Sequence, residues 1–191
     1  NRANLKNLYL HNPNQLFEPN GALLYNCLKK LQADKLIKGI GMSVYEPDEL
    51  EKLMQYFDFD TVQIPFSLVD QRFASNNLLE RLVMKNVEIN CRSIFLQGLL
   101  LMPYKKIPEK FKKWESLFRV WGEWLYENKI DPAHACIAGV KQNQQIHNIV
   151  IGVESADQLN QAIKFHNMPH NLVTNFPDIS FTNHHIIEYK F

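Results

Sequence analysis

Polar side chains follow five short apolar runs that are spread along the whole chain. The run at residues 8–10 ends in a histidine, which exchanges protons near neutral pH, and the later runs end in hydroxyl, amide or guanidinium groups. Each has a structural alternative, since a serine can cap a helix and a buried amide can be satisfied inside a core. Their shared position at strand ends favours a site made of His11, Ser43, Gln63, Arg92 with Ser93, and the segment 152–155.

These groups need a scaffold that brings strand ends together. Apolar runs alternate with longer stretches in which apolar residues recur every three or four positions, as in helices. We expect strands at residues 8–10, 37–42, 60–65, 87–91 and 148–152, and helices at 22–36, 47–57, 77–85, 108–128, 132–142 and from 155 onward. Repeated strand–helix units predict the α/β class with a parallel sheet.

Such a sheet is either open and doubly wound or closed into a barrel. The chain has no Gly-x-Gly-x-x-Gly turn, which disfavours the doubly wound dinucleotide-binding fold. A (β/α)8 TIM barrel has eight units in about 250 residues, whereas these 191 residues hold five. We therefore expect a partial barrel whose strand ends share one mouth. The chain begins without methionine on a strand, and the expectation is that about three units are missing before it.

Composition disfavours several classes of function. Lys and Arg number 21 against 20 Asp and Glu, and no basic tract stands out, so no nucleic-acid partner is expected. No stretch reaches the roughly 18 apolar residues of a membrane span, so no membrane partner is expected. The three cysteines are sparse and far apart, which is typical of a reducing compartment and predicts a cytoplasmic protein without a metal site. A metal-dependent hydrolase using His11 with His184 and His185 is a weaker alternative, because that pair lies in a polar tail.

Glycines mark places where another group can approach the backbone. Gly39 and Gly41 lie within a strand, where glycine often indicates close contact. Gly152 precedes a helix start whose free N–H groups favour a phosphate. The acidic Glu154 and Asp157 oppose it, so this signal is weak by itself.

In chain order, these segments resemble the motifs of the aldo-keto reductase family. Residues 8–13 are similar to its Leu-Leu-His-x-Pro strand end, and residues 40–43 to its Ile-Gly-Val-Ser-Asn segment. Residues 63–68 resemble Gln-x-x-Tyr-Asn-Leu, and residues 92–100 resemble Tyr-Ser-Pro-Leu-x-x-Gly-Leu-Leu. Residues 150–159 resemble the closing Ile-Pro-Gly-x-x-x-x-x-Gln-Leu motif.

The resemblance implies a (β/α)8 barrel that reduces a small-molecule carbonyl compound, an aldehyde or a ketone, with a nicotinamide cofactor, usually NADP. It maps this chain onto strands four to eight with their helices. Residues 1–191 would then be the C-terminal part of a single barrel domain.

The resemblance also implies a role for each matched residue. His11 matches the catalytic histidine that orients the substrate carbonyl, and Ser43 and Gln63 match the residues that hold the nicotinamide amide. Arg92 stands where the family usually has a tyrosine stacked on the nicotinamide. The other matched cofactor-binding positions, around the pyrophosphate and the adenosine, are Ser93, Gly98, Gly152, Ser155 and Gln158.

The resemblance leaves several matters open. The family's proton donor is a tyrosine assisted by a lysine and an aspartate of the first three units, so none of the three is assigned here. Gly152 and Gln158 replace the lysine and arginine that many members use for the 2′-phosphate, so NAD is the alternative to NADP. Together with Arg92 and Val44, which replaces an asparagine, Gln158 also leaves room for a non-catalytic barrel that binds a nucleotide or a partner. The substrate and the oligomeric state stay open, and residues 101–108 are expected to form one wall of the substrate pocket.

Overall fold

The computed structural model describes residues 4–180, which divide into two compact units. The first unit takes the chain up to Pro65 together with Arg72–Cys91. The second takes Phe66–Gln71 together with the chain from Arg92 onward. Each unit is described by itself below.

Strands of the first unit lie in chain order, as successive strand–helix units predict. They are β1 (Leu5–Leu10), β2 (Ile37–Ser43), β3 (Thr61–Pro65) and β4 (Glu88–Arg92), whose last residue enters the second unit. β1 pairs with β2 and β2 with β3, both in parallel. The register places Tyr9, Gly41 and Thr61 in one row across the sheet, and Ser43 beside Gln63.

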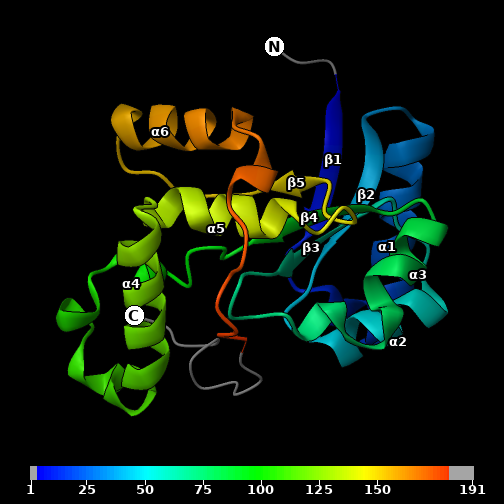
Figure 1. Ribbon diagram of the computed structural model, residues 1–191. Coiled ribbons are helices and arrows are strands. Elements are labelled where there is room, and N and C mark those ends of the chain that lie inside the picture. Colours follow the sequence, from blue (N-terminus) through cyan, green and yellow to red (C-terminus); the bar gives the residue numbers. More distant parts are fainter. Residues whose placement is uncertain (1–3, 181–191) are drawn as a thin grey trace. The chain divides into compact units, whose positions relative to one another are not determined.

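The helices of the first unit cover one face of these strands. They are α1 (Gly21–Ala33), α2 (Pro47–Tyr56) and α3 (Leu78–Met84), and Figure 1 shows them together on one side of the sheet. 3-10 turns at Pro13–Phe17 and Arg72–Asn77 precede α1 and α3. Toward this face the strands direct apolar side chains that are fully buried, Ile40, Met42, Val62, Ile64 and Ile89.

The opposite face of the strands is polar and carries a hydrogen-bonded group, Tyr9, Thr61 and Asn90. The Tyr9 hydroxyl lies 2.8 Å from Thr61 Oγ1, and Asn90 Nδ2 donates to both hydroxyl oxygens at 2.9 and 2.6 Å. Thr61 in turn donates to the Glu88 carbonyl at 2.9 Å. Burial raises the pKa of Tyr9, so the phenol stays protonated at neutral pH. A side chain at Gly41 would lie 2.5 Å from the Tyr9 ring, which confirms that this strand glycine permits close contact.

The second unit is mainly helical. It contains α4 (Glu115–Asn128), α5 (Pro132–Lys141), α6 (Ala156–Asn167) and the short strand β5 (Asn148–Ile149). 3-10 turns occur at Leu99–Leu101, Tyr104–Lys106, Glu109–Trp114 and His170–Leu172. α5 and α6 pack against each other, as Figure 1 shows.

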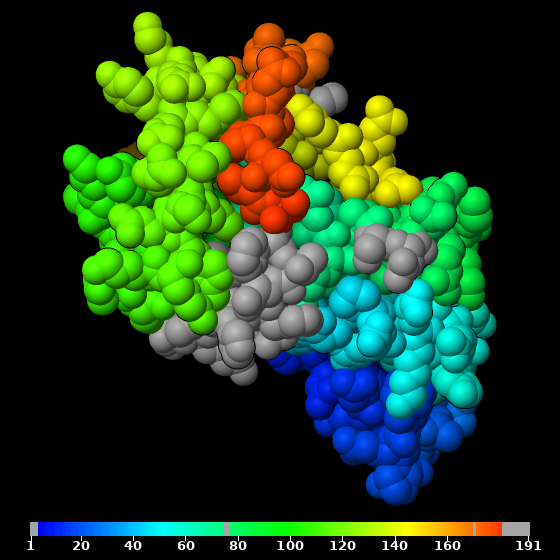
Figure 2. All heavy atoms as spheres, turned by 60° about the horizontal axis from the view of Figure 1, so that its bottom comes forward, coloured from blue at the N-terminus to red at the C-terminus, as the bar shows by residue number. Residues whose placement is uncertain are grey.

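An aromatic group anchors the end of the described chain to α4. The Trp124 ring stacks on Phe176 at 5.2 Å, and its Nε1 donates to the Asn175 carbonyl at 2.8 Å. In Figure 2 the red-orange segment that contains Asn175 lies against the green segment that contains α4. Trp121, which is 1% exposed, donates from Nε1 to the Leu100 carbonyl and so fixes the turn after β4.

The element order agrees with the sequence expectations, but several bounds differ, most of them by one residue; β1 begins at Leu5 rather than at residue 8. The first helix ends at Ala33 rather than at residue 36, because Lys35 adopts a left-handed conformation with φ of 59°. The expected helix at 108–128 begins with 3-10 turns and becomes α-helical only at Glu115. β5 ends at Ile149 rather than at residue 152. Among residues 4–180, no helix is long and apolar enough to cross a membrane.

Candidate active site

Ser43, the last residue of β2, lies beside Gln63, which is two residues before the carboxyl end of β3. The sheet register pairs them, and the backbone N–H of Val44 donates to the Gln63 carbonyl at 3.0 Å, which holds the two strand ends together. β1 pairs Leu10 with Met42, so the chain leaves β1 at His11 on the level where Ser43 ends β2. Three of the residues predicted from the sequence thus stand at neighbouring strand ends of one unit.

The Ser43 hydroxyl is buried without a hydrogen-bond partner. The residue is 3% exposed, and Oγ finds no partner among the residues that the structure describes. Leaving a buried hydroxyl unsatisfied costs about 1–3 kcal/mol. The serine does not cap the following helix, because no side chain bonds to the first turn of α2 there. Its oxygen therefore fits a polar ligand group, such as the amide of a nicotinamide.

His11 is exposed, and the loop that carries it is tied to the loop after β2. The His11 and Tyr45 rings meet edge to face, with centroids 6.4 Å apart. One carboxylate joins the two loops, since Glu49 accepts from the Tyr45 backbone N–H at 2.9 Å and from Asn14 Nδ2 at 2.8 Å. Neither Tyr45 nor Glu49 is predicted from the sequence to belong to the site. An acidic residue four positions after Tyr45, in the first turn of α2, was the available signal.

In the second unit, the segment after β4 has a run of unusual backbone conformations. Arg92 Nη1 lies 3.3 Å from Ser93 Oγ, and Ser93 itself has φ of 61°. Leu96, Gln97 and Gly98 have φ of 48°, 54° and 89°. Side-chain-bearing residues in this region cost about 1–3 kcal/mol each and concentrate at functional sites. This strained turn includes Ser93 and Gly98, two of the predicted cofactor-binding residues.

The N-terminus of α6 is capped by its own side chains. The backbone N–H of Gln158 donates to Ser155 Oγ at 3.2 Å, and the N–H of Glu154 donates to Gln158 Oε1 at 2.8 Å. This reciprocal arrangement resembles a capping box and explains Ser155 and Gln158 structurally. The predicted helix start at residue 155 is confirmed.

Two of the predicted cofactor-binding residues line a cavity of about 290 Å³ in the second unit. Gly152 and Gln158 stand on one part of its wall, while Asp131 and Gln161 contribute polar groups from α5 and α6. The rest of the lining is Phe95, Leu101, Pro132, Ala133, Ile151, Val153 and Ala162. No lysine or arginine lines this cavity within the described part of the chain.

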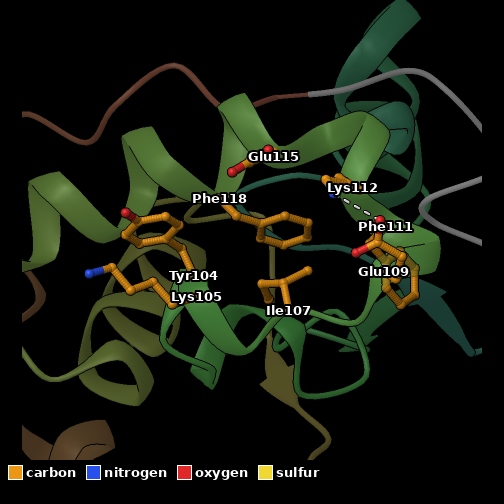
Figure 3. A pocket seen from close by; sticks show the side chains of 8 residues that line it. All are labelled: Tyr104, Lys105, Ile107, Glu109, Phe111, Lys112, Glu115 and Phe118. Carbon is orange, nitrogen blue, oxygen red and sulfur yellow. Dashed lines mark hydrogen bonds and ion pairs between the residues drawn. The ribbon is translucent and has the colours of Figure 1, made fainter.

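A second cavity, of about 330 Å³, opens beside the first turns of α4 (Figure 3). Tyr104, Ile107 and Phe118 supply its apolar surface, and Lys112 is paired with Glu109 at 2.9 Å across its edge. The segment 101–108, expected to form a pocket wall, thus lines a cavity through Tyr104, Lys105 and Ile107.

Thiols and metal-binding groups add no further site. Cys91 and Cys136 are buried free thiols, and Cys27 is exposed. Burial raises the pKa of the Cys91 thiol to about 12 and also raises that of Cys136, so both are unreactive at neutral pH. Within residues 4–180, no cluster of three His, Cys, Asp or Glu side chains suits a metal ion. His184 and His185 lie outside the described residues.

Comparison with known proteins gives a family and a fold. The family model described as "Aldo/keto reductase family" matches residues 1–172. No curated protein matches the chain. Among solved structures, the holo form of the aldo-keto reductase AKR11C1 from Bacillus halodurans has a TM-score of 0.63 and 13% identity, and the match covers 87% of this chain and 56% of that one.

Two further structures agree. The thermostable aldo-keto reductase Tm1743, in complex with the inhibitor epalrestat, has a TM-score of 0.63 and 15% identity, with 87% and 56% of the two chains covered. A mutant of Gox0644 in complex with NADPH has a TM-score of 0.62 and 20% identity, with 87% and 55% covered. At these identities the match shows the fold alone, an α/β barrel of which this chain spans a little over half the length.

Proposed function

The chain belongs to the aldo/keto reductase family, and we propose that it forms the cofactor-holding part of an NAD(P)H-dependent oxidoreductase that reduces an aldehyde or a ketone. The observation that carries this proposal is the Ser43 hydroxyl, which is buried and has no partner among the described residues, at the end of β2 beside Gln63 of the parallel strand β3. A nicotinamide carboxamide offers both a donor and an acceptor to such a pair.

Each residue of the first unit has a defined task in this proposal. Ser43 and Gln63 bind the carboxamide and so fix which face of the ring is presented. A reduced nicotinamide, when bound, supplies a hydride to the carbonyl carbon. His11 donates a hydrogen bond to the carbonyl oxygen, which orients the substrate and stabilises the negative charge that develops there. The Glu49 contacts to Tyr45 and Asn14 hold the His11 loop in place for this role.

The second unit would bind the rest of the dinucleotide. Ser93 and Gly98, in the strained turn after β4, are proposed to contact the pyrophosphate, and Gly152, Ser155 and Gln158 to contact the adenosine half. Arg92 would lie under the nicotinamide, where its planar guanidinium can stack on the ring. Its positive charge would oppose an oxidised, cationic ring, so Arg92 would favour binding of the reduced cofactor over the oxidised one.

We assign residues 1–191 to the C-terminal part of a single barrel domain. The length of the solved relatives, of which this chain spans a little over half, supports that assignment. The proton donor would then come from the part of the barrel that these residues do not supply. The three free thiols support a reducing, cytoplasmic location.

The proposal is tested with the protein as its gene encodes it. We expect the reading frame to supply further βα units bearing a tyrosine and a lysine before Asn1. We also expect the protein to oxidise a reduced nicotinamide dinucleotide only when an aldehyde or ketone is present. Because an alkoxide must be protonated as it forms, loss of the acid costs on the order of 10²–10⁴-fold, so residues 1–191 alone should be far slower. Equal turnover by the 191 residues alone would refute the assignment as part of a barrel.

A second candidate is a barrel that binds a nucleotide or a partner without turnover. The specific observation in its favour is Val44, which is fully buried where the family usually has a polar residue, together with Arg92. Saturable binding of the dinucleotide by the gene-encoded protein, with no turnover of any aldehyde or ketone offered, would favour this candidate.

A further inference from the structure

We propose that the cavity lined by Asp131, Gly152, Gln158 and Gln161 accepts an adenosine ribose with a free 2′-hydroxyl, so that the protein binds NAD in preference to NADP. Asp131 is assigned as the residue that excludes the 2′-phosphate. This inference rests on the proposed function, because it takes the cavity to be the adenosine end of the dinucleotide site. It replaces the family expectation of NADP with a different cofactor.

Asp131 is held in a fixed position at this cavity. It is the N-cap of α5, where Oδ1 accepts from the backbone N–H groups of Ala133 at 2.8 Å and His134 at 3.3 Å. Its other oxygen, Oδ2, lies 3.3 Å from Gln161 Nε2, so α6 contacts the same carboxylate. The Asp131 carboxylate therefore lies at a defined place in the cavity wall, where it opposes an anionic ligand group.

The other polar groups of the cavity suit hydroxyl groups rather than a phosphate. Gln158 Oε1 accepts from the Glu154 backbone N–H, which leaves the Gln158 amide nitrogen to donate to a ligand. Gln161 is already engaged with Asp131. A ribose hydroxyl can donate to the Asp131 carboxylate and accept from the Gln158 amide. Charge-assisted hydrogen bonds of this kind are stronger than neutral ones.

A 2′-phosphate would find no compensation for its charge. It carries about 1.5 to 2 negative charges at neutral pH and is normally bound by arginine or lysine, yet no cation lines this cavity among the described residues. The helix N-termini offer little, because Asp131 already takes two N–H groups of α5 and Ser155 takes the N–H of Gln158. The exposed Glu154 and Asp157 add negative charge at the start of α6. Lys141, at the far end of α5, donates to the His166 carbonyl.

The test is a binding experiment that needs no turnover. The full chain is titrated with NADH and NADPH, and separately with ADP-ribose and its 2′-phosphorylated form, while tryptophan fluorescence is followed. We expect the ligands with a free 2′-hydroxyl to bind at least about tenfold more tightly, as one like-charge contact predicts. The Asp131→Asn variant should bring the affinity ratio close to one, mainly by strengthening the binding of the phosphorylated ligands.

The variants separate charge from folding. Asparagine caps helices about as well as aspartate, so the α5 N-terminus is preserved in Asp131→Asn. Glu127→Gln removes the same charge from an exposed position on α4 and should leave the ratio unchanged. Equal or tighter binding of NADPH by the unmodified chain would overturn this inference and leave the proposed function standing. If Asp131→Asn leaves the ratio unchanged, the assignment of Asp131 is wrong. Failure of all four ligands to bind would overturn the proposed function and this inference together.

Discussion

Two buried hydroxyl side chains on the polar face of the sheet differ in one respect that bears on function. Thr61 both accepts and donates hydrogen bonds within the group it forms with Tyr9 and Asn90. Ser43, two register pairs further toward the carboxyl end of β2, has no partner among the described residues. A hydroxyl that is satisfied supports the fold, whereas an unsatisfied one is held at a cost and fits a ligand.

This difference predicts opposite effects of two similar substitutions. Thr61→Val leaves Asn90 and Tyr9 without a shared partner and should lower the free energy of unfolding by about 1–3 kcal/mol. Ser43→Ala removes an unsatisfied group, so it should leave that free energy unchanged or raise it by up to about 1 kcal/mol, while weakening the binding of NADH. Urea unfolding and a fluorescence titration measure the two quantities.

Comparing the unfolding free energies of the two variants tests whether the Ser43 hydroxyl serves the fold or a ligand. If Ser43→Ala destabilises the protein as much as Thr61→Val, the Ser43 hydroxyl supports the fold and not a ligand. Unchanged binding of NADH in Ser43→Ala would likewise remove Ser43 from the cofactor site.

At the residue scale, the sequence predicted the strand-end groups but missed those that depend on contacts between distant elements. His11, Ser43 and Gln63 could be found because each follows an apolar run. Asp131, which we propose as a ligand group, was not predicted from the sequence because its signal, an acidic residue directly before Pro132, indicates a helix cap. Its closeness to Gln158 and Gln161 arises only when α5 and α6 pack together.

At the scale of elements, the helix starts were easier to predict than the helix ends. Proline or serine marks the starts of α2, α5 and α6. The ends of α1, α3 and α4 carry no glycine, although each adopts the left-handed turn that glycine usually supplies. At α1, the N–H of Leu36 donates to the Leu31 carbonyl and that of Lys35 to the Gln32 carbonyl, which is the Schellman arrangement. A sequence pattern that looks for glycine therefore runs past Ala33.

The same ends predict a stabilising change. Lys35 and Lys129 are exposed residues with φ of 59° and 53°. Replacing either with glycine removes the strain of the side chain, and we expect the free energy of unfolding to rise by about 0.5–1 kcal/mol. Lys30→Gly, in the last turn of α1 itself, is the matched control and should lower it by about 1 kcal/mol.

Urea midpoints at constant slope report these differences. A loss of stability in both Lys35→Gly and Lys129→Gly would contradict the assigned helix ends.

The end of β5 could not be predicted from the sequence for a different reason. Val150 and Ile151 have strand propensity, but a β-branched run becomes a strand only where a neighbouring backbone pairs with it, and no propensity scale contains that information.

At the scale of the whole molecule, each unit contains one buried thiol, Cys91 in the first and Cys136 in the second. Burial raises the pKa of Cys91 from 9.0 to about 12 and raises that of Cys136 as well. A thiol whose pKa is higher in the folded state stabilises the fold fully below pH 9. That contribution is lost as the pH rises from about 9 toward 12, because the unfolded chain then releases the proton first.

We therefore expect alkaline destabilisation. At pH 10 the free energy of unfolding should be lower than at pH 7 by about 1.4 kcal/mol for each such thiol. In Cys91→Ala, the difference in the free energy of unfolding between pH 7 and pH 10 should shrink by that amount. Because each variant is compared with itself at the two pH values, the cost of the smaller side chain cancels. An unchanged difference in Cys91→Ala would show that this thiol ionises equally in the folded and unfolded states.

The α/β class, the element order and the family could all be inferred from the sequence, because apolar periodicity and strand-end motifs are local signals. The proposed activity is tested most directly by following the hydride. The gene-encoded protein is given a reduced nicotinamide dinucleotide deuterated at the transferable position, together with an aldehyde. We expect deuterium on the alcohol carbon, and a slower transfer in His11→Ala than in the unmodified protein. Dinucleotide binding with no deuterium in any alcohol product would contradict it.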